Sequence, residues 1–582
     1  MPSEVAGSVQ YYIDRAVELE DIKKPWLPHF QSLAEIYLTR KMDFTRMIVP
    51  GQFLQADVFD NTGQFSAYLM ASVFLSMMWP DSSRTFTLEP VRRLKGLPGV
   101  EEYFKFATEE MYSAMDNPKA GLSLALMEYF LDQGIFGTSG VAVLDGPEDS
   151  LTNPVLYDAW SIKTMTIAEN AQGFVDTVYY KRELTVRQIM IEYANSPDLI
   201  SPKVKEQFAN GKPDEKVTVL YVIEPKSPTK GMKGVAAMSV RTLHIDVTNR
   251  FQMREGGYHE MPIFVGRMFK SLDEPYGRSS GMLGLPDAES LNVLSEAILV
   301  ASEKQLDPPL GVLDDGRLGG GVIDTSAGAL NVFNSAGRMS NEKPIFPLFT
   351  VGEMQSAAEQ KKELKGAVAQ AFFLDRLLDL NNQTQMTAYE TSVRNQMRGE
   401  ALGAIFSRHE KEVLTPLVQR TFNILWRRGQ LGVVKTGIGA RIMAAWDKIV
   451  GADKLVVPAA VLQAAAQGLD VFEVKYISPA KRFMQAEKLQ GIFTATDAIV
   501  ALAPVLPGIT DNLNPDTLAH DIFTYSGAPK NSLRTSDDVL KFRAANAQKQ
   551  AQADKLAAAE QASKIGLNSA NSRAALGTVK GA

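Results

Sequence analysis

The stretch from about residue 280 to 428 constrains the fold most, because it alternates helical patterns with two segments that cannot be helical. Its first helix is predicted to open at Leu285-Pro286-Asp287, where proline is tolerated in a first turn and aspartate favours the positive end of the helix dipole. Apolar residues then recur at three- and four-residue spacing, at Leu291, Leu294, Ile298 and Ala301. Two prolines at Asp307-Pro308-Pro309 end the helix, because they cannot continue its hydrogen bonds.

A Gly-rich segment with β-like pattern follows, and Thr350-Val351-Gly352-Glu353 then has the capping-box pattern of a second helix, expected to last to about residue 380. The next residues, 381–385, are polar and uncharged. Another capping box, Thr387-Ala388-Tyr389-Glu390, predicts a long helix to about Arg428, with a kink at Pro416. About 40 residues in one helix would span roughly 60 Å.

Composition excludes several functional classes. The chain has 582 residues, which allows three or four domains, and its formal net charge of -6 argues against a conventional basic nucleic-acid clamp. Cysteine is absent, so disulfides and thiolate metal sites are excluded, and no two of the five histidines have the spacing of a helical zinc pair. The N-terminal residues lack the pattern of a signal peptide. The apolar segment 65–79 is shorter than the roughly 20 residues of a membrane span, so we expect a buried helix.

The residues before 273 are predicted to form a mixed α+β region. We expect helices at 8–41, bent near Pro25 and Pro28, and at 65–79, 100–113 and 119–132, with a helix start at Thr185. Strands are expected at 140–144, 173–180, 217–223, 238–247 and 262–268. A loop rich in lysine, proline and aspartate is expected at 195–216.

After the central stretch, we expect a helix at 438–449, a strand at 472–477 and a helical bundle from 480 onward. The segment 541–582 is rich in alanine and glutamine and mostly basic. It is interpreted as a solvated helix that frays into a tail, with a contact to nucleic acid or an acidic partner as the alternative.

Three motifs suggest chemistry without supporting it. Gly277-Arg278-Ser279-Ser280-Gly281 matches a hydrolase nucleophile elbow, but Pro275 stands where the strand should run and the expected helix starts too late. A triple glycine at 319–321 lacks the lysine of a phosphate loop. Asp314 and Asp315, with Asp324 nearby, are interpreted as a hydrated loop rather than a metal site. We therefore predict no catalytic residue, metal or cofactor, and keep a serine hydrolase using Ser279 as an alternative.

The order of Glu274-Pro275-Tyr276-Gly277-Arg278-Ser279, Leu285-Pro286-Asp287, a Leu-rich helix and Asp307-Pro308-Pro309 resembles the head-to-tail connecting, or portal, proteins of short-tailed bacteriophages. Further elements fit the same family: Asp60-Asn61-Thr62-Gly63 before an apolar helix, and Phe372-Phe373-Leu374 followed by Thr387-Ala388-Tyr389-Glu390. The resemblance extends from about residue 10 to 540.

This resemblance implies an α+β, mainly α, subunit that assembles into a ring of about twelve copies at one capsid vertex, with double-stranded DNA passing through without sequence specificity. It also implies a division of the chain, namely a wing at 1–273, a stem helix at 274–307, a clip at 308–349, a second stem helix at 350–373, a channel loop at 374–386, a long kinked helix at 387–430, a return to the wing at 431–478 and a crown at 479–540. Expected partners are a terminase motor, a tail adaptor, and capsid, scaffolding and internal core proteins, with no membrane. The expected location is the virion, after assembly in the host cytoplasm.

A channel in which DNA slides cannot hold phosphates tightly, because each neutralised phosphate adds affinity through counterion release. The uncharged segment Asn381, Asn382, Gln383, Thr384 and Gln385 suits sliding. Lys361, Lys362, Lys365 and Arg376 are candidates for transient DNA contacts, and solvated or intersubunit charges are the open alternative. Candidate clip contacts are Asp314, Asp315, Arg317, Asn331 and Arg338. A non-ring α-rich adaptor remains a further alternative.

Overall fold

The computed structural model describes most of the chain. The chain divides into two compact units, with the boundary in the sequence between Met484 and Gln485. The described residues are 8–49, 51–80, 84–147, 153–194, 196–227, 238–314, 324–334, 345–347, 355–377, 402–432, 456–477, 479–502, 513–526 and 541–553, with the single residues 235, 508, 539 and 555.

The chain begins with two helices joined by a 3-10 turn. α1 spans Val9–Lys23 and is capped by Ser8, whose side chain accepts a hydrogen bond from the amide of Tyr11. The turn Lys24–Trp26 and the start of α2, Leu27–Tyr37, contain Pro25 and Pro28, so the break in the α-helical pattern lies where the prolines predict it.

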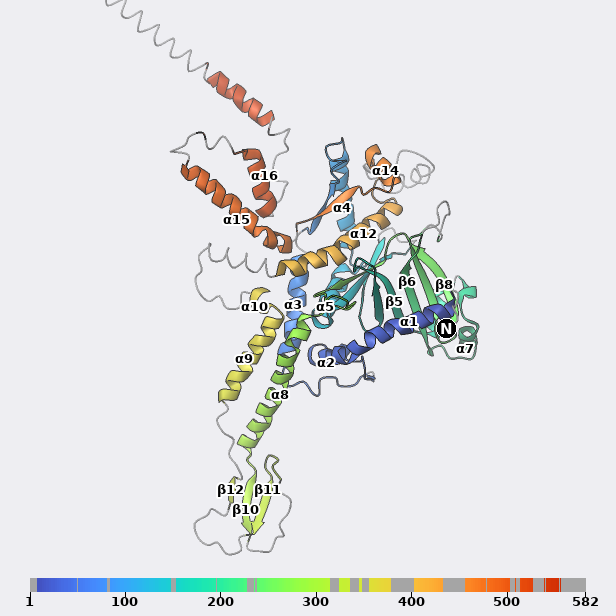
Figure 1. Cartoon of the computed structure of the whole chain (residues 1–582), viewed down its shortest axis with the longest axis vertical. Helices are drawn as coiled ribbons and strands as arrows, with labels where there is room; N and C mark the ends of the chain where they lie inside the picture. The colour runs from blue at the N-terminus through green and yellow to red at the C-terminus, as the bar shows by residue number, and fades with distance from the viewer. Residues whose placement is uncertain are drawn as a thin grey trace, which may run out of the picture. The chain divides into compact units, whose positions relative to one another are not determined.

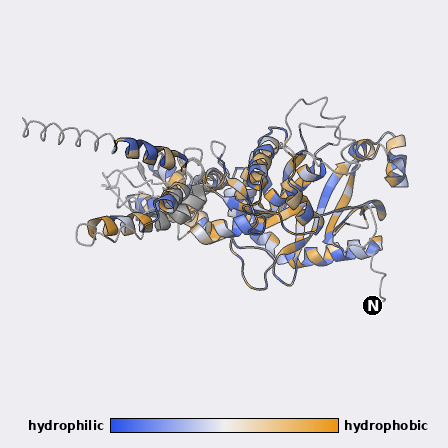
Figure 2. Cartoon of the chain, turned by 90° about the horizontal axis from the view of Figure 1, so that it is seen from above, coloured by the Kyte–Doolittle hydropathy of each residue, from blue (hydrophilic) through white to orange (hydrophobic). Residues whose placement is uncertain are grey.

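Three helices and part of α2 build the main core of the first unit. They are α3 (Thr62–Met78), α4 (Val100–Met115) and α5 (Leu122–Phe136). All three were expected from the sequence, and the apolar helix at 65–79 is buried rather than membrane-spanning. The alternation of apolar and polar residues along the helices is visible in Figure 2. No helix among the described residues is long and apolar enough to cross a bilayer.

A five-stranded antiparallel sheet has the order β4-β5-β6-β7-β8. Its strands are Met165–Glu169, Val175–Thr185, Lys216–Pro225, Val240–Asp246 and Phe251–Tyr258. Val217 and Val219 pack with one apolar cluster, whereas Leu220 and Val222 pack with another that includes α1, as the two-residue period of a strand requires. Figure 1 shows α1 lying along this sheet.

The first of these two clusters corrects the loop expected at 195–216. That segment contains a 3-10 turn, Pro197–Leu199, and helix α7, Pro202–Ala209, after α6, Val186–Glu192. Ile200 and Val204 are buried against Val217 and Met253, so tertiary burial overrides the polar composition.

Two smaller sheets join distant parts of the sequence. β2 (Thr138–Asp145) lies between β3 (Val155–Trp160) and β9 (Ile263–Arg267), and all pairs are antiparallel. β1 (Phe86–Pro90) pairs with β13 (Phe472–Tyr476), so the strand expected at 472–477 returns to the N-terminal core.

The central stretch forms a pair of helices connected through a small sheet (Figure 1). α8 spans Ser280–Leu306 and ends at Asp307 as predicted, but it begins earlier than the expected Leu285. The sheet has the order β11-β10-β12, with strands Leu310–Asp314, Leu330–Asn334 and Ile345–Pro347. α9 spans Gln355–Ala371 and runs back along α8, and α10 spans Leu374–Leu377. Helix α9 was expected to continue to about residue 380, but Phe373 has a φ of 58°, which breaks the helix.

The remaining described helices are a helical segment at 402–409, α12 (Thr415–Arg427) and α14 (Ala459–Ala466), with α15 (Pro479–Leu502), α16 (Pro515–Ser526) and an exposed helical segment at 541–553 following. α16 belongs to the second unit, where Asp516 pairs with Arg543. The helical character expected after residue 480 is therefore confirmed. The predicted helix at 438–449 and the capping boxes at 350–353 and 387–390 lie outside the described residues.

Candidate functional site

The start of α8 is fixed by the motif Glu274–Ser279, which packs against Thr138, the first residue of β2. The Tyr276 ring is fully buried and lies 5.9 Å from the ring of Trp26, centroid to centroid. The amide of Gly277 donates to Thr138 Oγ1 at 2.8 Å. A Cβ at Gly277 would lie 2.6 Å from the carbonyl oxygen of Gly137, so this approach requires glycine. The packing of this motif therefore fixes the residue at which α8 begins.

Ser279 caps α8 and has no free hydroxyl. Its Oγ accepts a hydrogen bond from the amide of Met282 at 3.0 Å and donates to the carbonyl of Ile135 at 2.7 Å. The side chain is fully buried. The helix does follow Ser279 directly, contrary to the sequence expectation, but the geometry is that of an N-cap rather than an exposed nucleophile. The hydrolase alternative gains no support.

Asp60 joins three helices at one buried carboxylate. Its Oδ1 accepts hydrogen bonds from the amide and hydroxyl of Thr62 in the first turn of α3. Its Oδ2 lies 3.3 Å from Lys361 Nζ and 3.2 Å from Lys365 Nζ on α9, and it accepts from Ser295 Oγ on α8 at 3.4 Å. Only 5% of the Asp60 side chain is exposed. The contact therefore ties the α8–α9 pair to the core.

The neighbouring residues extend this joint along α8. Asn292 Oδ1 accepts from the amide of Phe59 at 2.7 Å, and Asn292 Nδ2 donates to the carbonyl of Asp57 at 2.9 Å. Nearer its N-terminus, α8 approaches α9 closely at Gly284, which faces Ala371. A Cβ atom added at Gly284 would lie only 2.8 Å from the Cβ of Ala371.

The charge state of Asp60 reflects these contacts. Burial raises its pKa, but the hydrogen bonds from Thr62 and the ammonium of Lys365 outweigh burial and lower the pKa to about 2. Asp60 is therefore ionised at neutral pH and compensates two lysines.

This joint changes the interpretation of the candidate channel lysines. Lys361 and Lys365 lie within ion pairs of their own subunit, so their charge is already compensated. The side chain of Lys362 is exposed, and it makes no hydrogen bond or ion pair with any residue that the structure describes. The side chain of Arg376 and the segment Asn381–Gln385 lie outside the described residues.

The candidate clip residues are only partly described. Asn331 is buried, and its amide exchanges hydrogen bonds of 2.6 Å with the backbone of Asp324, so it stabilises the turn from within. Asp324 Oδ1 accepts from the amide and hydroxyl of Ser326. The side chain of Asp314 and residues Asp315, Arg317 and Arg338 lie outside the described part. No group of three or more acidic or histidine side chains within the described ranges could hold a metal ion.

The helix around Pro416, where the sequence predicts a kink, contains a π-helical turn just before the proline. Residues Glu410–Leu414 form a π-helical turn, and Pro416 lies in the first turn of α12. π-Helical turns are rare and are one of the few causes of helix kinks. The disruption therefore spans residues 410–416.

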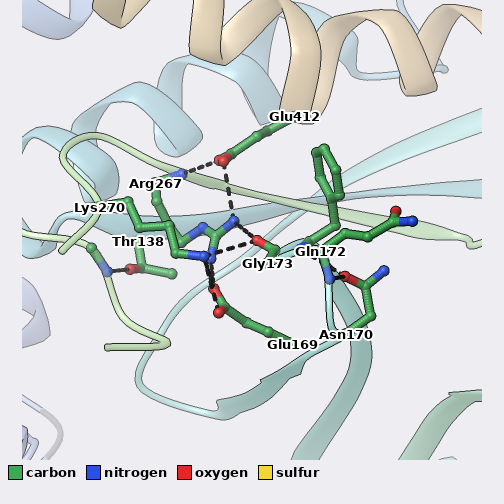
Figure 3. A network of polar contacts seen from close by, with 10 residues as sticks. Thr138, Glu169, Asn170, Gln172, Gly173, Arg267, Lys270 and Glu412 are labelled. Atoms are coloured by element: carbon green, nitrogen blue, oxygen red, sulfur yellow. Dashed lines mark hydrogen bonds and ion pairs between the residues drawn. The ribbon is translucent and has the colours of Figure 1, made fainter. Parts of the chain in front are cut away.

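A buried ionic network holds the π-helical turn against the sheets (Figure 3). Arg267, at the end of β9, is 1% exposed, and its Nη1 is paired with Glu169. Its Nη2 donates to Glu412 Oε1 at 3.1 Å and to the carbonyl of Gly173 at 2.9 Å, while its amide donates to Glu412 Oε2 at 3.0 Å. Lys270 Nζ donates to Glu169 Oε2 at 3.0 Å. The network links one residue of the π-helical turn to two sheets.

Sequence reasoning missed the roles of Asp60, Arg267 and Glu412. The sequence does contain one local signal for Asp60 and one for Arg267. Asp60 lies two residues before a helix, where its carboxylate can accept from the free amides of the first turn, and Arg267 ends an otherwise apolar strand, where a charge requires a partner. Their partners were not deducible, because they lie far away in the sequence.

Comparison with known proteins decides the family. The sequence profile of the family described as "Bacteriophage head to tail connecting protein" matches residues 10–533. The chain belongs to this family.

The individual relatives have low sequence identity to this chain. The chain is 24% identical over 419 residues to the "Probable portal protein" of Bordetella phage BPP-1, covering 70% of this chain and 73% of that protein. It is 23% identical over 384 residues to the "Portal protein" of Salmonella phage epsilon15, covering 64% of this chain and 66% of that protein. Among solved structures, it is similar to a chain of the "Virion of native gene transfer agent (GTA) particle", with 15% identity, a TM-score of 0.29 and coverage of 73% of this chain and 95% of that chain.

Replacing Asp60 by asparagine is expected to lower the free energy of unfolding at neutral pH by about 1–2 kcal/mol, because the charge on two lysines loses its compensation. A carboxylate whose pKa is lower in the folded state than in the unfolded state stabilises the fold at pH values above its unfolded-state pKa. This stabilisation is lost as the pH falls through the folded-state pKa. The wild-type advantage should therefore shrink between about pH 4 and pH 2, which urea unfolding at several pH values measures. Asp57→Asn, an exposed neighbour with the same change of charge, is the control, and an equal effect there would contradict the joint.

Arg267→Met is expected to destabilise the unassembled subunit by about 3 kcal/mol or more, because it leaves Glu169 and Glu412 without their shared buried cation. The matched control is Arg84→Met, whose exposed pair with Glu109 should cost less than about 1 kcal/mol. Chemical unfolding measures both variants. Similar losses for the two arginines would show that the network does not stabilise the fold.

Proposed function

We propose that this chain is a portal subunit that assembles into a ring of about twelve copies at one capsid vertex, through which double-stranded DNA is packaged and later ejected. Family membership over residues 10–533 supports the proposal, together with the names of the two phage relatives. The structural observation that carries it is the α8–α9 pair. Two antiparallel helices, 27 and 17 residues long, are tied to a well-packed core at one end and lead to a small sheet at the other. Such pairs can line a channel side by side.

In this proposal the elements take the parts that the family resemblance implies. The sheets and helices before residue 273 form the wing, α8 and α9 the stem, and β10–β12 the clip between them. Residues 374–386 form the channel loop, residues 387–430 the long kinked helix, and residues 479–540 the crown. The β1–β13 pairing supports a return of the chain to the wing at 431–478.

The charges on α9 suit passage of a duplex. DNA carries a charge about every 1.7 Å along its axis, and each bound phosphate adds salt-dependent affinity that opposes sliding. Asp60 compensates Lys361 and Lys365, so the stem offers fewer free cations than its sequence suggests. A net charge of -6 for the whole subunit acts in the same direction.

The proposal assigns the work of packaging to a separate terminase motor, because the sequence carries no ATP-binding loop motif. The clip would meet that motor first and a tail adaptor afterwards. Capsid, scaffolding and core proteins would contact the remaining surfaces, with assembly in the host cytoplasm before incorporation into the virion.

Free strand edges suggest how the clip becomes ordered. β11 and β12 are the outer strands of their sheet, and no described strand pairs with the outer edge of either. Edges of this kind readily accept a strand from another chain, so we propose that each clip pairs with its neighbours in the ring.

Deletion of residues 319–335, which contain β11, is expected to convert the assembly into monomers or aggregates. Light scattering or native mass spectrometry measures the mass of both proteins. The undeleted control should form a particle near twelve times 63.9 kDa. A stable monomer of the full chain would contradict the portal proposal in favour of a non-ring adaptor. A clean ring from the deleted chain would contradict only the clip pairing.

A further inference from the structure

One face of α8 has the pattern of a helix seam, but no helix in the described part of the chain covers it. The face is defined by six residues at alternating three- and four-residue spacing, named here the outer stripe: Leu283, Pro286, Ser290, Val293, Ala297 and Val300. All six are exposed, with Leu283 at 64%, Val293 at 63% and Val300 at 42%. Small and apolar residues at this spacing are typical of a seam into which a second helix packs.

An acidic row follows the edge of the outer stripe. Glu289, Glu296 and Glu303 recur every seven residues and are all exposed. None of their side chains makes a hydrogen bond or an ion pair with any residue in the described ranges. In a helix seam, charged residues at such flanking positions select a partner that carries the opposite charge.

Within the described residues, the packing of the chain does not use this surface. The buried side of α8 contains Gly284, Ala288, Leu291 and Ser295, which lie on the opposite face of the helix. This side contacts α2, α3, α5 and α9 of the same subunit. The outer stripe and its acidic edge therefore suit a helix of another molecule that carries an exposed cation at the same height.

We propose that the outer stripe packs against α9 of a second copy of this chain, with Lys362 of that copy between Glu289 and Glu296. This inference rests on the ring of the proposed function and specifies its stem interface. Lys362 is the exposed lysine of α9 that Asp60 does not bind. It is thereby assigned to a subunit contact rather than to DNA.

The internal geometry of one subunit sets the register. Gly284 lies opposite Ala371, and Asp60 bridges Ser295 to Lys361, so positions on α8 and α9 at equal height have residue numbers that add to about the same sum. The proposed interface takes α8 as parallel to the ring axis, so that rotation from one copy to the next preserves height along the helix. Lys362 of the next copy is therefore level with Val293, about 4.5 Å along the axis from Glu296 and about 6 Å from Glu289. A lysine side chain reaches either carboxylate.

Other charges on α9 fit this edge less well. Glu359 and Glu363 are also exposed, but at 100° per residue they lie about 60° and 100° further around the helix from Lys362. Gly366 has no atom within 4 Å of a Cβ position, which leaves room there for a side chain of the outer stripe.

Charge reversal tests the pairing. Glu296→Lys and Lys362→Glu are each expected to raise the subunit concentration for half-maximal ring assembly by about fivefold at low salt, because each places like charges together. The exchanged variant, Glu296→Lys with Lys362→Glu, should return close to the wild-type value. Glu206→Lys on α7, an exposed glutamate with the same change of charge, is the control and should have no effect. Native mass spectrometry over a dilution series measures each value.

A second measurement uses the absence of cysteine. In the variant Glu296→Cys with Lys362→Cys, a short bis-maleimide is expected to produce a ladder of covalent oligomers, whereas each single-cysteine variant should not. Rings that assemble normally in both charge-reversed variants and give no ladder would overturn this interface while leaving the portal proposal intact. Failure of the unmodified chain to form any ring would instead overturn the proposed function.

Discussion

The arrangement of the central helices depends on one buried carboxylate. Asp60 compensates two lysines of α9, accepts from a serine of α8 and accepts from the amide of Thr62 at the start of α3, so three helices meet at a single charge. The low exposure of its carboxylate makes these ion pairs less sensitive to screening by salt than an ion pair in which both partners lie on the surface. The apolar residues Leu285, Leu291 and Val368 add to this joint, because they are buried in the same core as α3 and α5.

A second buried charge plays a matching part in the long helix. Arg267 holds Glu412 of the π-helical turn against the strands, so the direction in which the chain leaves that turn is tied to the sheets. Both joints use a central ion that several groups satisfy, which is the condition under which a buried charge is tolerated. Together they define the two ends of the segment that contains the proposed channel loop.

Local patterns were sufficient to predict many elements. The apolar period gave α3, α4 and α5, alternation gave β6, and the two prolines after Asp307 gave the end of α8. The start of α8 was misplaced, because the hydroxyl of Ser279 is held by the carbonyl of Ile135, and such a contact leaves no local pattern. The segment 195–216 was misread because Val204 is buried by residues from other strands.

The candidate site was predictable in type but not in detail. The sequence indicates which lysines lie on α9, but the compensation of Lys361 and Lys365 depends on an aspartate in a remote part of the chain. Lys362 remains without such a partner among the described residues. The difference between the compensated lysines Lys361 and Lys365 and the exposed Lys362 is therefore a property of the fold.

The central claim is that α8 and α9 line a hole that exists only when many copies close around it. Electron cryomicroscopy of the purified assembly, viewed along its symmetry axis, tests this most directly. The account predicts a closed ring whose central opening admits a duplex, with the α8–α9 pairs side by side around it and the segment 381–385 at its wall. A solitary compact particle, or a ring with α8 and α9 remote from the opening, would contradict it.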